Sequence, residues 1–222
     1  MTIAVEVLEP FAAEAATRLA PELSGAASII LTGGTTAADV YSLLPRRCFR
    51  PGASVFFSDE RCVPPDHESS NYAMATAKLS LEGDDRIVVH RMRGEDDPRH
   101  AAAGYHDAIA PLAGPGIDVA LLGLGADCHI AALFPGSPVL DESSERLCAA
   151  VDRPDGLGGL TLTPPALAMA NRVFVVVAGT SKREAVERLL RGDETLQDCP
   201  ARLLDELPDV ILVGDRACIG SV

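Results

Sequence analysis

Two short apolar runs, each followed by a glycine, constrain the fold of this chain more than any other feature. Residues 117–122 read IDVALL, residues 172–178 read RVFVVVA, and Gly123 and Gly179 follow these runs. A strand that is apolar at almost every position is buried on both faces, which is typical of a parallel sheet between helices. Since such runs alternate with segments of helical spacing, the sequence predicts an α/β fold.

The remaining segments continue this alternation. Further strands are predicted at residues 28–32, 53–58, 87–90 and 209–213, with weaker candidates at 147–151 and 160–163. Helices are predicted at residues 11–23, 35–44, 72–81, 97–110 and 181–190. We expect a single Rossmann-like domain over residues 1–222, with a mainly parallel sheet, helices on both faces, and a loop at 153–159.

The charge of the chain limits its partners. It has 19 Lys+Arg against 32 Asp+Glu, a formal net charge of −13 at pH 7. Nucleic acids and anionic membranes bind basic surfaces, so neither is an expected partner, whereas a few local cations can still bind a small anion. The six cysteines lack metal-binding spacing, and neither a signal peptide nor a long apolar run is visible. We therefore expect a cytoplasmic protein with reduced thiols.

Polar residues follow four predicted strands, whose carboxyl ends meet at one edge of a parallel sheet. The first loop, LTGGTT at 31–36, places Gly33 and Gly34 before Thr35 and Thr36 at the start of a helix. Free N–H groups and hydroxyls at such a point suit a phosphate. The alternative is an ordinary glycine turn with a threonine as the helix cap.

The second loop, SDERCVPPDHESSNY at 58–72, is expected to be a polar turn. Arg61 is a candidate to bind an anion, and Asp59 a candidate to orient a cation or a hydroxyl. Ser69 or Ser70 is expected to cap the next helix. Ordinary surface charge is the alternative interpretation of this segment.

The third and fourth loops add a histidine and a lysine. In GLGADCHIAALFPG at 123–136, Asp127 and His129 flank Cys128, so the carboxylate can set the tautomer of the imidazole. Lys182 stands at a helix start, where a positive charge opposes the helix dipole unless an anion lies nearby. The alternatives are a structural histidine and a solvated lysine.

Taken in order, these segments resemble the 6-phosphogluconolactonase family, in the superfamily that also contains glucosamine-6-phosphate deaminase. The resemblance covers nearly the whole chain and rests on LTGGTTAADVYSLL, FFSDERCVPPDHESSNYAMA, DVALLGLGADCHIAALFPGSP and RVFVVVAGTSKREAV. Arg61 and the ALFPG segment favour the lactonase branch, because a DEY-like turn and an AFNEPG-like segment are expected of the deaminases.

The resemblance implies hydrolysis of 6-phospho-D-glucono-1,5-lactone to 6-phosphogluconate in the oxidative pentose phosphate pathway. It implies no metal or organic cofactor, and we expect a monomer or a small homo-oligomer with a sugar phosphate as its small-molecule partner. The resemblance also implies that His129 is the catalytic base, with Asp127 beside it. It implies that the glycine–threonine loop and Lys182 bind the phosphate, and that Arg61 contacts the substrate. An imidazole can take a proton from the attacking water and return it to the leaving ring oxygen, while Arg61 stabilises the oxyanion.

Three positions depart from the family pattern. Cys128 stands where glycine is usual, and a positive φ there would cost a cysteine about 1–2 kcal/mol and displace His129. Gly159 stands where an arginine is expected to help hold the phosphate, and Arg153 is a candidate substitute. GGTTA also replaces GGSTP. The alternatives are therefore a sugar-phosphate lactonase or isomerase of shifted specificity, and a non-catalytic sugar-phosphate-binding protein.

Overall fold

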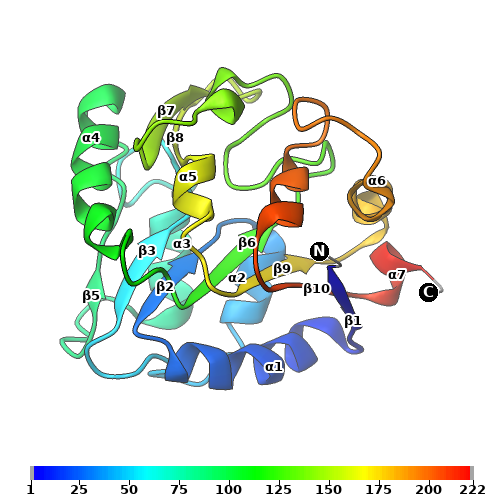
Figure 1. The fold of residues 1–222 in the computed structure, drawn as a ribbon. Helices are drawn as coiled ribbons and strands as arrows, with labels where there is room; N and C mark the ends of the chain where they lie inside the picture. The colour runs from blue at the N-terminus through cyan, green and yellow to red at the C-terminus, as the bar shows by residue number, and fades with distance from the viewer. Residues whose placement is uncertain (1–2, 221–222) are drawn as a thin grey trace.

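The structure is a computed structural model that describes residues 3–220, and its centre is a seven-stranded parallel sheet (Figure 1). The strand order is β1-β10-β9-β6-β2-β3-β5, and every pair of neighbours is parallel. The strands are β1 (Ala4–Val7), β2 (Ser28–Leu31), β3 (Ser54–Phe57), β5 (Val88–Val89), β6 (Val119–Gly123), β9 (Val173–Val177) and β10 (Val210–Gly214). The predicted α/β fold with a mainly parallel sheet is confirmed.

Helices cover both faces of this sheet. One face packs on α1 (Phe11–Gly25), α2 (Thr35–Tyr41) and α3 (Asn71–Leu79). The other packs on α4 (Pro98–Ile109), α5 (Pro164–Leu167), α6 (Arg183–Arg191) and α7 (Arg216–Ile219). Short 3-10 turns are η1 (Ala110–Leu112), η2 (Pro138–Asp141), η3 (Thr180–Lys182) and η4 (Pro200–Glu206). Between residues 3 and 220, no helix is long and apolar enough to cross a membrane.

The burial of the central strands explains their uniformly apolar sequences. In β9, Val173, Val175 and Val177 belong to one hydrophobic core, while Phe174 and Val176 belong to the other. Successive side chains of a strand point to opposite faces, and here both faces are covered by helices. The run therefore shows no alternation of polar and apolar residues.

A second, smaller sheet lies beside the first and was not expected. It is antiparallel, with the order β4-β8-β7, and consists of β4 (Asp59–Arg61), β8 (Gly158–Leu162) and β7 (Cys148–Asp152). The prediction that residues 59–61 form a polar turn is wrong, because these residues pair with β8. A short charged strand is stabilised by its distant partner, which local sequence patterns do not reveal.

Helix starts also differ from expectation at two points. The residue that caps α2 is Gly34, at φ 95°, and no side chain caps this helix, so the predicted threonine cap is wrong. Ser70 caps α3 as predicted, accepting a hydrogen bond from the N–H of Ala73. The predicted helix at 181–190 is divided, with Lys182 ending η3 and α6 beginning at Arg183.

The topology opens a crevice between β2 and β6. The chain adds β3 and β5 on one side of β2, then adds β6, β9 and β10 on the other side. Such a reversal of winding is the place where open α/β sheets bind ligands, at the carboxyl ends of the strands. At the carboxyl ends of these two strands, Gly123, the last residue of β6, donates its N–H to Thr32 Oγ1 across the crevice at 3.3 Å.

Candidate active site

A cavity of about 170 Å³ occupies this crevice. The structure gathers around it every predicted site residue except Asp127, which lies beside His129. The cavity is lined by residues from the ends of β2, β6 and β9 and from the smaller sheet: Thr32, Gly33, Gly34, Thr35, Thr36, Ala37, Asp59, Arg61, Asn71, Gly123, Leu124, Gly125, His129, Ala131, Arg153, Val176, Val177 and Lys182.

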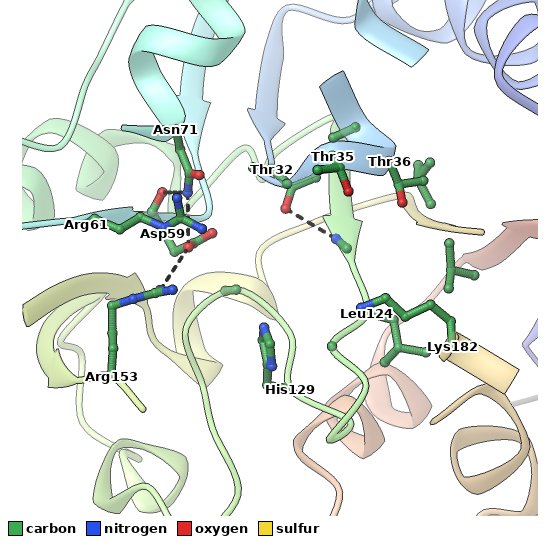
Figure 2. Close-up of a pocket in the computed structure, with 18 residues that line it drawn as sticks. Thr32, Thr35, Thr36, Asp59, Arg61, Asn71, Leu124, His129, Arg153 and Lys182 are labelled. Carbon is green, nitrogen blue, oxygen red and sulfur yellow. Dashed lines mark hydrogen bonds and ion pairs between the residues drawn. The ribbon is translucent and has the colours of Figure 1, made fainter. Parts of the chain in front are cut away.

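The polar side chains form two groups with His129 between them (Figure 2). We call the first group the threonine wall, which consists of Thr32, Thr35, Thr36 and Lys182. We call the second group the arginine wall, which consists of Asp59, Arg61, Asn71 and Arg153. The threonine wall belongs to the segments that follow β2 and β9, including the start of α2 and the end of η3. The arginine wall belongs to β4, to the residue after β7 and to the start of α3.

His129 is oriented by Asp127. Its Nδ1 lies 2.5 Å from Asp127 Oδ1, and its ring packs against Phe134 with the centroids 4.6 Å apart. Since a carboxylate can only accept a hydrogen bond, Nδ1 carries the proton and Nε2 is a proton acceptor in the neutral ring. Burial is the largest single influence and raises the pKa of Asp127, but the hydrogen bond and the electrostatic attraction of His129, together with backbone N–H donors, outweigh it and lower that pKa to about 2.

The tight turn at residues 125–129 brings Asp127 and His129 together. The N–H of Gly125 donates to the carbonyl of His129 at 2.8 Å, and the N–H of Cys128 donates to the carbonyl of Gly125 at 3.1 Å. A Cβ atom at Gly125 would lie 2.0 Å from His129 Nδ1, so only glycine fits there. Cys128 has φ 70°, the strained conformation that the sequence suggested, yet His129 still meets Asp127.

The threonine wall rests mainly on backbone geometry. Gly34 ends the loop after β2, so the first N–H groups of α2 and the hydroxyls of Thr35 and Thr36 lie at the cavity. Beneath the loop, the buried Tyr41 hydroxyl accepts from the N–H of Thr32 and donates to its carbonyl, both at 3.1 Å. The half-buried Lys182 approaches from the end of η3. Together they present N–H, O–H and ammonium donors.

The arginine wall is held instead by side-chain contacts. Asp59 accepts hydrogen bonds from Ser58 Oγ at 2.8 Å and from Asn71 Nδ2 at 3.1 Å, and it lies 3.8 Å from Arg153 Nη1. The side chain of Arg153 is only 9% exposed, and its guanidinium lies 5.4 Å from the centre of the Phe134 ring. Arg153 donates hydrogen bonds to Asp155 at 3.2 and 3.1 Å, and Asp59 adds a longer ion pair to the same guanidinium.

Gly159 leaves the space that Arg153 occupies. A Cβ atom at position 159 would lie 2.9 Å from Arg153 Cδ and 3.0 Å from its Cγ. The stem of Arg153 thus crosses the strand where the family arginine is expected, and the two side chains cannot coexist without a shift. The sequence left open whether Arg153 reaches the site, and the structure places it there.

The side chains of residues 59–61 point in alternating directions, because successive side chains of a strand lie on opposite faces. They therefore have two different roles. Glu60 points away from the cavity and accepts from Ser70 Oγ and from the N–H groups of Arg61, Asn71 and Tyr72, which anchors α3 to β4. Arg61 lines the cavity and donates from Nη1 to the carbonyl of Ser69. Among residues 3–220, its buried Nε has no acceptor.

The sequence interpretation missed Asn71 and Thr32 as site residues. Asn71 Nδ2 donates to the carbonyl and the carboxylate of Asp59, and a Cβ atom at Gly33 would lie 1.8 Å from Asn71 Oδ1. Asn71 therefore links the arginine wall to Gly33 in the loop that follows β2. Its position after the Ser70 cap was the available signal, but a helix-starting asparagine is common. In the described part of the chain, no three His, Cys, Asp or Glu side chains cluster as metal ligands.

The fold and the site together define a class of protein: an α/β protein with a loop of N–H and O–H donors and a His–Asp pair at the switch point of a parallel sheet. Residues 3–212 match the family described as Glucosamine-6-phosphate isomerases/6-phosphogluconolactonase. The chain belongs to this family, and the resemblance seen in its sequence is confirmed.

Relatives with two different names have the same percentage identity to this chain, over alignments of different length. The 6-phosphogluconolactonase of Synechocystis sp. is 35% identical over 201 residues, which cover 86% of this chain and 83% of the relative. The glucosamine-6-phosphate deaminase of Rhodopirellula baltica is 35% identical over 178 residues, which cover 74% of this chain and 70% of the relative. The crystal structure of the devB protein superposes with a TM-score of 0.83 at 28% identity, covering 98% of both chains.

Proposed function

We propose that this chain hydrolyses 6-phospho-D-glucono-1,5-lactone to 6-phosphogluconate, with His129 as the general base and acid. The observation that carries the proposal is the His129–Asp127 pair, with its 2.5 Å contact, at a cavity bordered by two arginines and a lysine. An acid–base group beside several cations suits the hydrolysis of an anionic ester. The 6-phosphogluconolactonase names among the relatives support the same reaction.

In this mechanism, His129 Nε2 takes a proton from a water molecule that attacks the C1 carbonyl carbon of the lactone. The carbonyl oxygen becomes an oxyanion, and Arg61 is the cation proposed to stabilise it. The protonated imidazole then gives its proton to the ring oxygen as the bond between C1 and that oxygen breaks. Acid–base catalysis of this kind contributes about 10²–10⁴-fold to the rate.

The phosphate group is proposed to lie against the glycine–threonine loop. Gly33, Gly34, Thr35 and Thr36 offer backbone and hydroxyl donors at the start of α2, and Lys182 adds a positive charge. Arg153 is proposed to add a second charge from the arginine wall, as the substitute for the family arginine absent at Gly159. The proposed partner is thus a small sugar phosphate, and we propose a cytoplasmic location and a monomer or small homo-oligomer.

A deaminase-like or isomerase-like activity on an amino sugar phosphate is the second candidate, since a relative with the deaminase name is equally identical. Arg61 in the 59–61 triplet and the ALFPG segment, which includes Phe134, favour the lactonase. The same cavity could also bind sugar phosphates without catalysis. These candidates share the fold and differ in what happens to the bound ligand.

The test is hydrolysis of freshly generated 6-phosphogluconolactone, coupled to 6-phosphogluconate dehydrogenase and corrected for spontaneous ring opening. Wild type, His129→Ala and the matched control His100→Ala are compared, because His100 is an exposed histidine on α4. We expect a rate in the wild type and the control, and a fall in kcat of about 10²–10⁴-fold for His129→Ala. A folded wild type without a rate above background contradicts the proposal.

Two further substrates separate the alternatives. Unphosphorylated gluconolactone tests whether the phosphate is required, and glucosamine 6-phosphate tests the deaminase reaction. Calorimetric titration with 6-phosphogluconate in the absence of turnover would identify a protein that binds without catalysis.

A further inference from the structure

The side chain of Phe134, in the ALFPG segment, is buried but lies outside the hydrophobic cores. It is 9% exposed, yet within residues 3–220 it belongs to neither of the two apolar clusters that cover the faces of the sheet. Its neighbours Ile130 and Leu133 both belong to one of these clusters. A large aromatic ring usually contributes to a core, so the burial of this ring needs another explanation.

The ring of Phe134 lies against two polar side chains of the site. The imidazole of His129 is tilted by 48° to it, with the centroids 4.6 Å apart, and the guanidinium carbon of Arg153 lies 5.4 Å from its centre. Both distances are in the range of favourable aromatic and cation–π contacts. One ring therefore touches the proposed base and also the arginine that is proposed to replace the one absent at Gly159.

A tight turn fixes the position of this ring. The N–H of Ser137 donates to the carbonyl of Phe134 at 3.0 Å, and Gly136 has φ 73°. Proline at the second position and a glycine of positive φ at the third are typical of a type II turn. The N–H of Gly136 also donates to the carbonyl of Gln197 at 2.9 Å. The turn is thus tied to a distant segment, and Phe134 starts from a fixed backbone.

The contacts with the ring complement the hydrogen bonds of its two neighbours. Asp127 holds one edge of the His129 imidazole, and Asp155 holds one edge of the Arg153 guanidinium. A hydrogen bond at one edge leaves a planar group free to tilt about that edge. An aromatic ring packed against the plane limits this tilt for both groups.

We propose that Phe134 is a positioning residue that holds His129 and Arg153 in place for the reaction, an inference that rests on the proposed lactonase function. Phe134 itself is not one of the described residues that line the cavity. It therefore acts through its two neighbours, and the loss of its ring should change two separate quantities. The rate changes through His129, and the binding of a phosphorylated ligand changes through Arg153.

The first experiment compares Phe134→Leu with wild type in the full chain. We expect kcat for 6-phosphogluconolactone to fall about 10-fold, because small displacements of a catalytic group are costly. The dissociation constant of 6-phosphogluconate, measured by calorimetry, should rise about 5-fold with the loss of a desolvated cation–π contact. A folded Phe134→Leu with wild-type kcat and wild-type binding would overturn the proposal.

Phe49→Leu is the matched control for this substitution. Phe49 is 3% exposed and belongs to the hydrophobic core on the side of α1, α2 and α3. Its replacement should lower the stability in urea and leave kcat and binding unchanged. Circular dichroism checks that each variant is folded. If Phe134→Leu does not fold, Phe134→Met takes its place, because methionine adapts to irregular spaces.

Double variants distinguish positioning from a general loss of packing. In the Arg153→Ala background, Phe134→Leu should raise the dissociation constant less than about two-fold further, because the partner of the ring is already absent. In the His129→Ala background, the same change should leave the residual rate within about two-fold. Effects that multiply in full in both backgrounds would contradict the proposal.

These measurements also separate the role of Phe134 from the proposed function. A wild type that neither hydrolyses the lactone nor binds 6-phosphogluconate overturns the proposed function. A wild type that binds without hydrolysis overturns the lactonase reaction, and the binding measurements then decide the role of Phe134. An active wild type with an equally active Phe134→Leu overturns the positioning role alone.

Discussion

The two walls of the cavity are built in different ways. The threonine wall is formed by backbone: strands of the parallel sheet end, a glycine turns the chain, and a helix begins with its N–H groups at the cavity. The arginine wall is formed by side chains on a three-residue strand, at the start of α3 and on the hairpin next to the strand. Asp155 holds Arg153, the carbonyl of Ser69 holds Arg61, and Asn71 holds Asp59.

Because of this difference, the two walls are suited to recognise different parts of a ligand. Backbone donors at a helix start bind an anion with little dependence on side chains, so the threonine wall is suited to a common group such as phosphate. Side-chain charges can change with a few substitutions, so the arginine wall is suited to distinguish one sugar phosphate from another. His129 lies between the two walls with Asp127 beside it, and the proposed function assigns the proton chemistry to this pair. Four substitutions test this comparison.

The largest expected effect is that of Asp127→Asn, which keeps the shape of the side chain and removes its charge. A hydrogen bond to a charged group is worth about 1.5–3 kcal/mol, so kcat should fall about 10–100-fold with little change in KM. A steady-state comparison with wild type checks this result. An increase in KM alone would instead assign Asp127 to binding.

The acid stability of Asp127→Asn provides a second readout. The folded-state pKa of Asp127, about 2, lies below its ordinary value, so the ionised carboxylate stabilises the fold above about pH 4. This contribution is lost as the pH falls toward 2. Denaturant unfolding should therefore show wild type more stable than the variant at neutral pH, with the difference shrinking below pH 4.

The next effect is that of Arg153→Ala, which removes one of the cations of the arginine wall. We expect KM for the phosphorylated lactone to rise about ten-fold, the lower end of the value for a charge-assisted bond. The change should be much smaller with unphosphorylated gluconolactone. An equal loss on both lactones would place Arg153 at the sugar ring instead of the phosphate.

Gly159→Arg is the matched control for this prediction. In the Arg153→Ala background, an arginine at 159 regains the family arrangement and should recover part of the lost affinity. In the wild-type background the same substitution places a Cβ atom 2.9 Å from Arg153 Cδ and should lower stability. If Gly159→Arg does not recover affinity in the Arg153→Ala background, the result contradicts the proposal that Arg153 takes the place of the family arginine.

The smallest kinetic effect is expected for Glu60→Gln, in the middle of the 59–61 triplet. Glu60 accepts hydrogen bonds from three backbone N–H groups and one hydroxyl, and an amide would place a donor against one of them. Stability should fall by about 1–3 kcal/mol, measured by urea unfolding, while kcat/KM stays within about two-fold. A large kinetic loss would show that Glu60 takes part in more than the anchoring of α3.

The two walls also differ in how far the sequence predicts them. The runs 117–122 and 172–178, with their following glycines, identify a parallel sheet and its ligand-binding edge by local patterns alone. Every member of the threonine wall except Thr32, together with His129, is therefore predicted from segments that are continuous in the chain. Their place at one cavity then follows from the topology of the sheet.

The arginine wall depends on pairing between distant segments. Asp59 pairs with Thr161 about a hundred residues later, and nothing in the charged triplet itself indicates a strand. Arg153 enters the cavity because Gly159 lacks a Cβ atom, which is visible only when both residues are placed in space. The role of Asn71 is not visible in the sequence either, because Asp59 and Gly33, the residues that it contacts, lie far from it along the chain.

The contacts of Asn71 with Asp59 and Gly33 have a thermodynamic consequence. With Asp59 also held by Ser58, the rotamers of these side chains are set before any ligand arrives. Ordering a mobile side chain on binding costs about 0.5–1.5 kcal/mol, and here that cost is met during folding. Binding of a sugar phosphate should then show a small conformational-entropy penalty, carried mainly by Lys182, whose long side chain has the most freedom to lose.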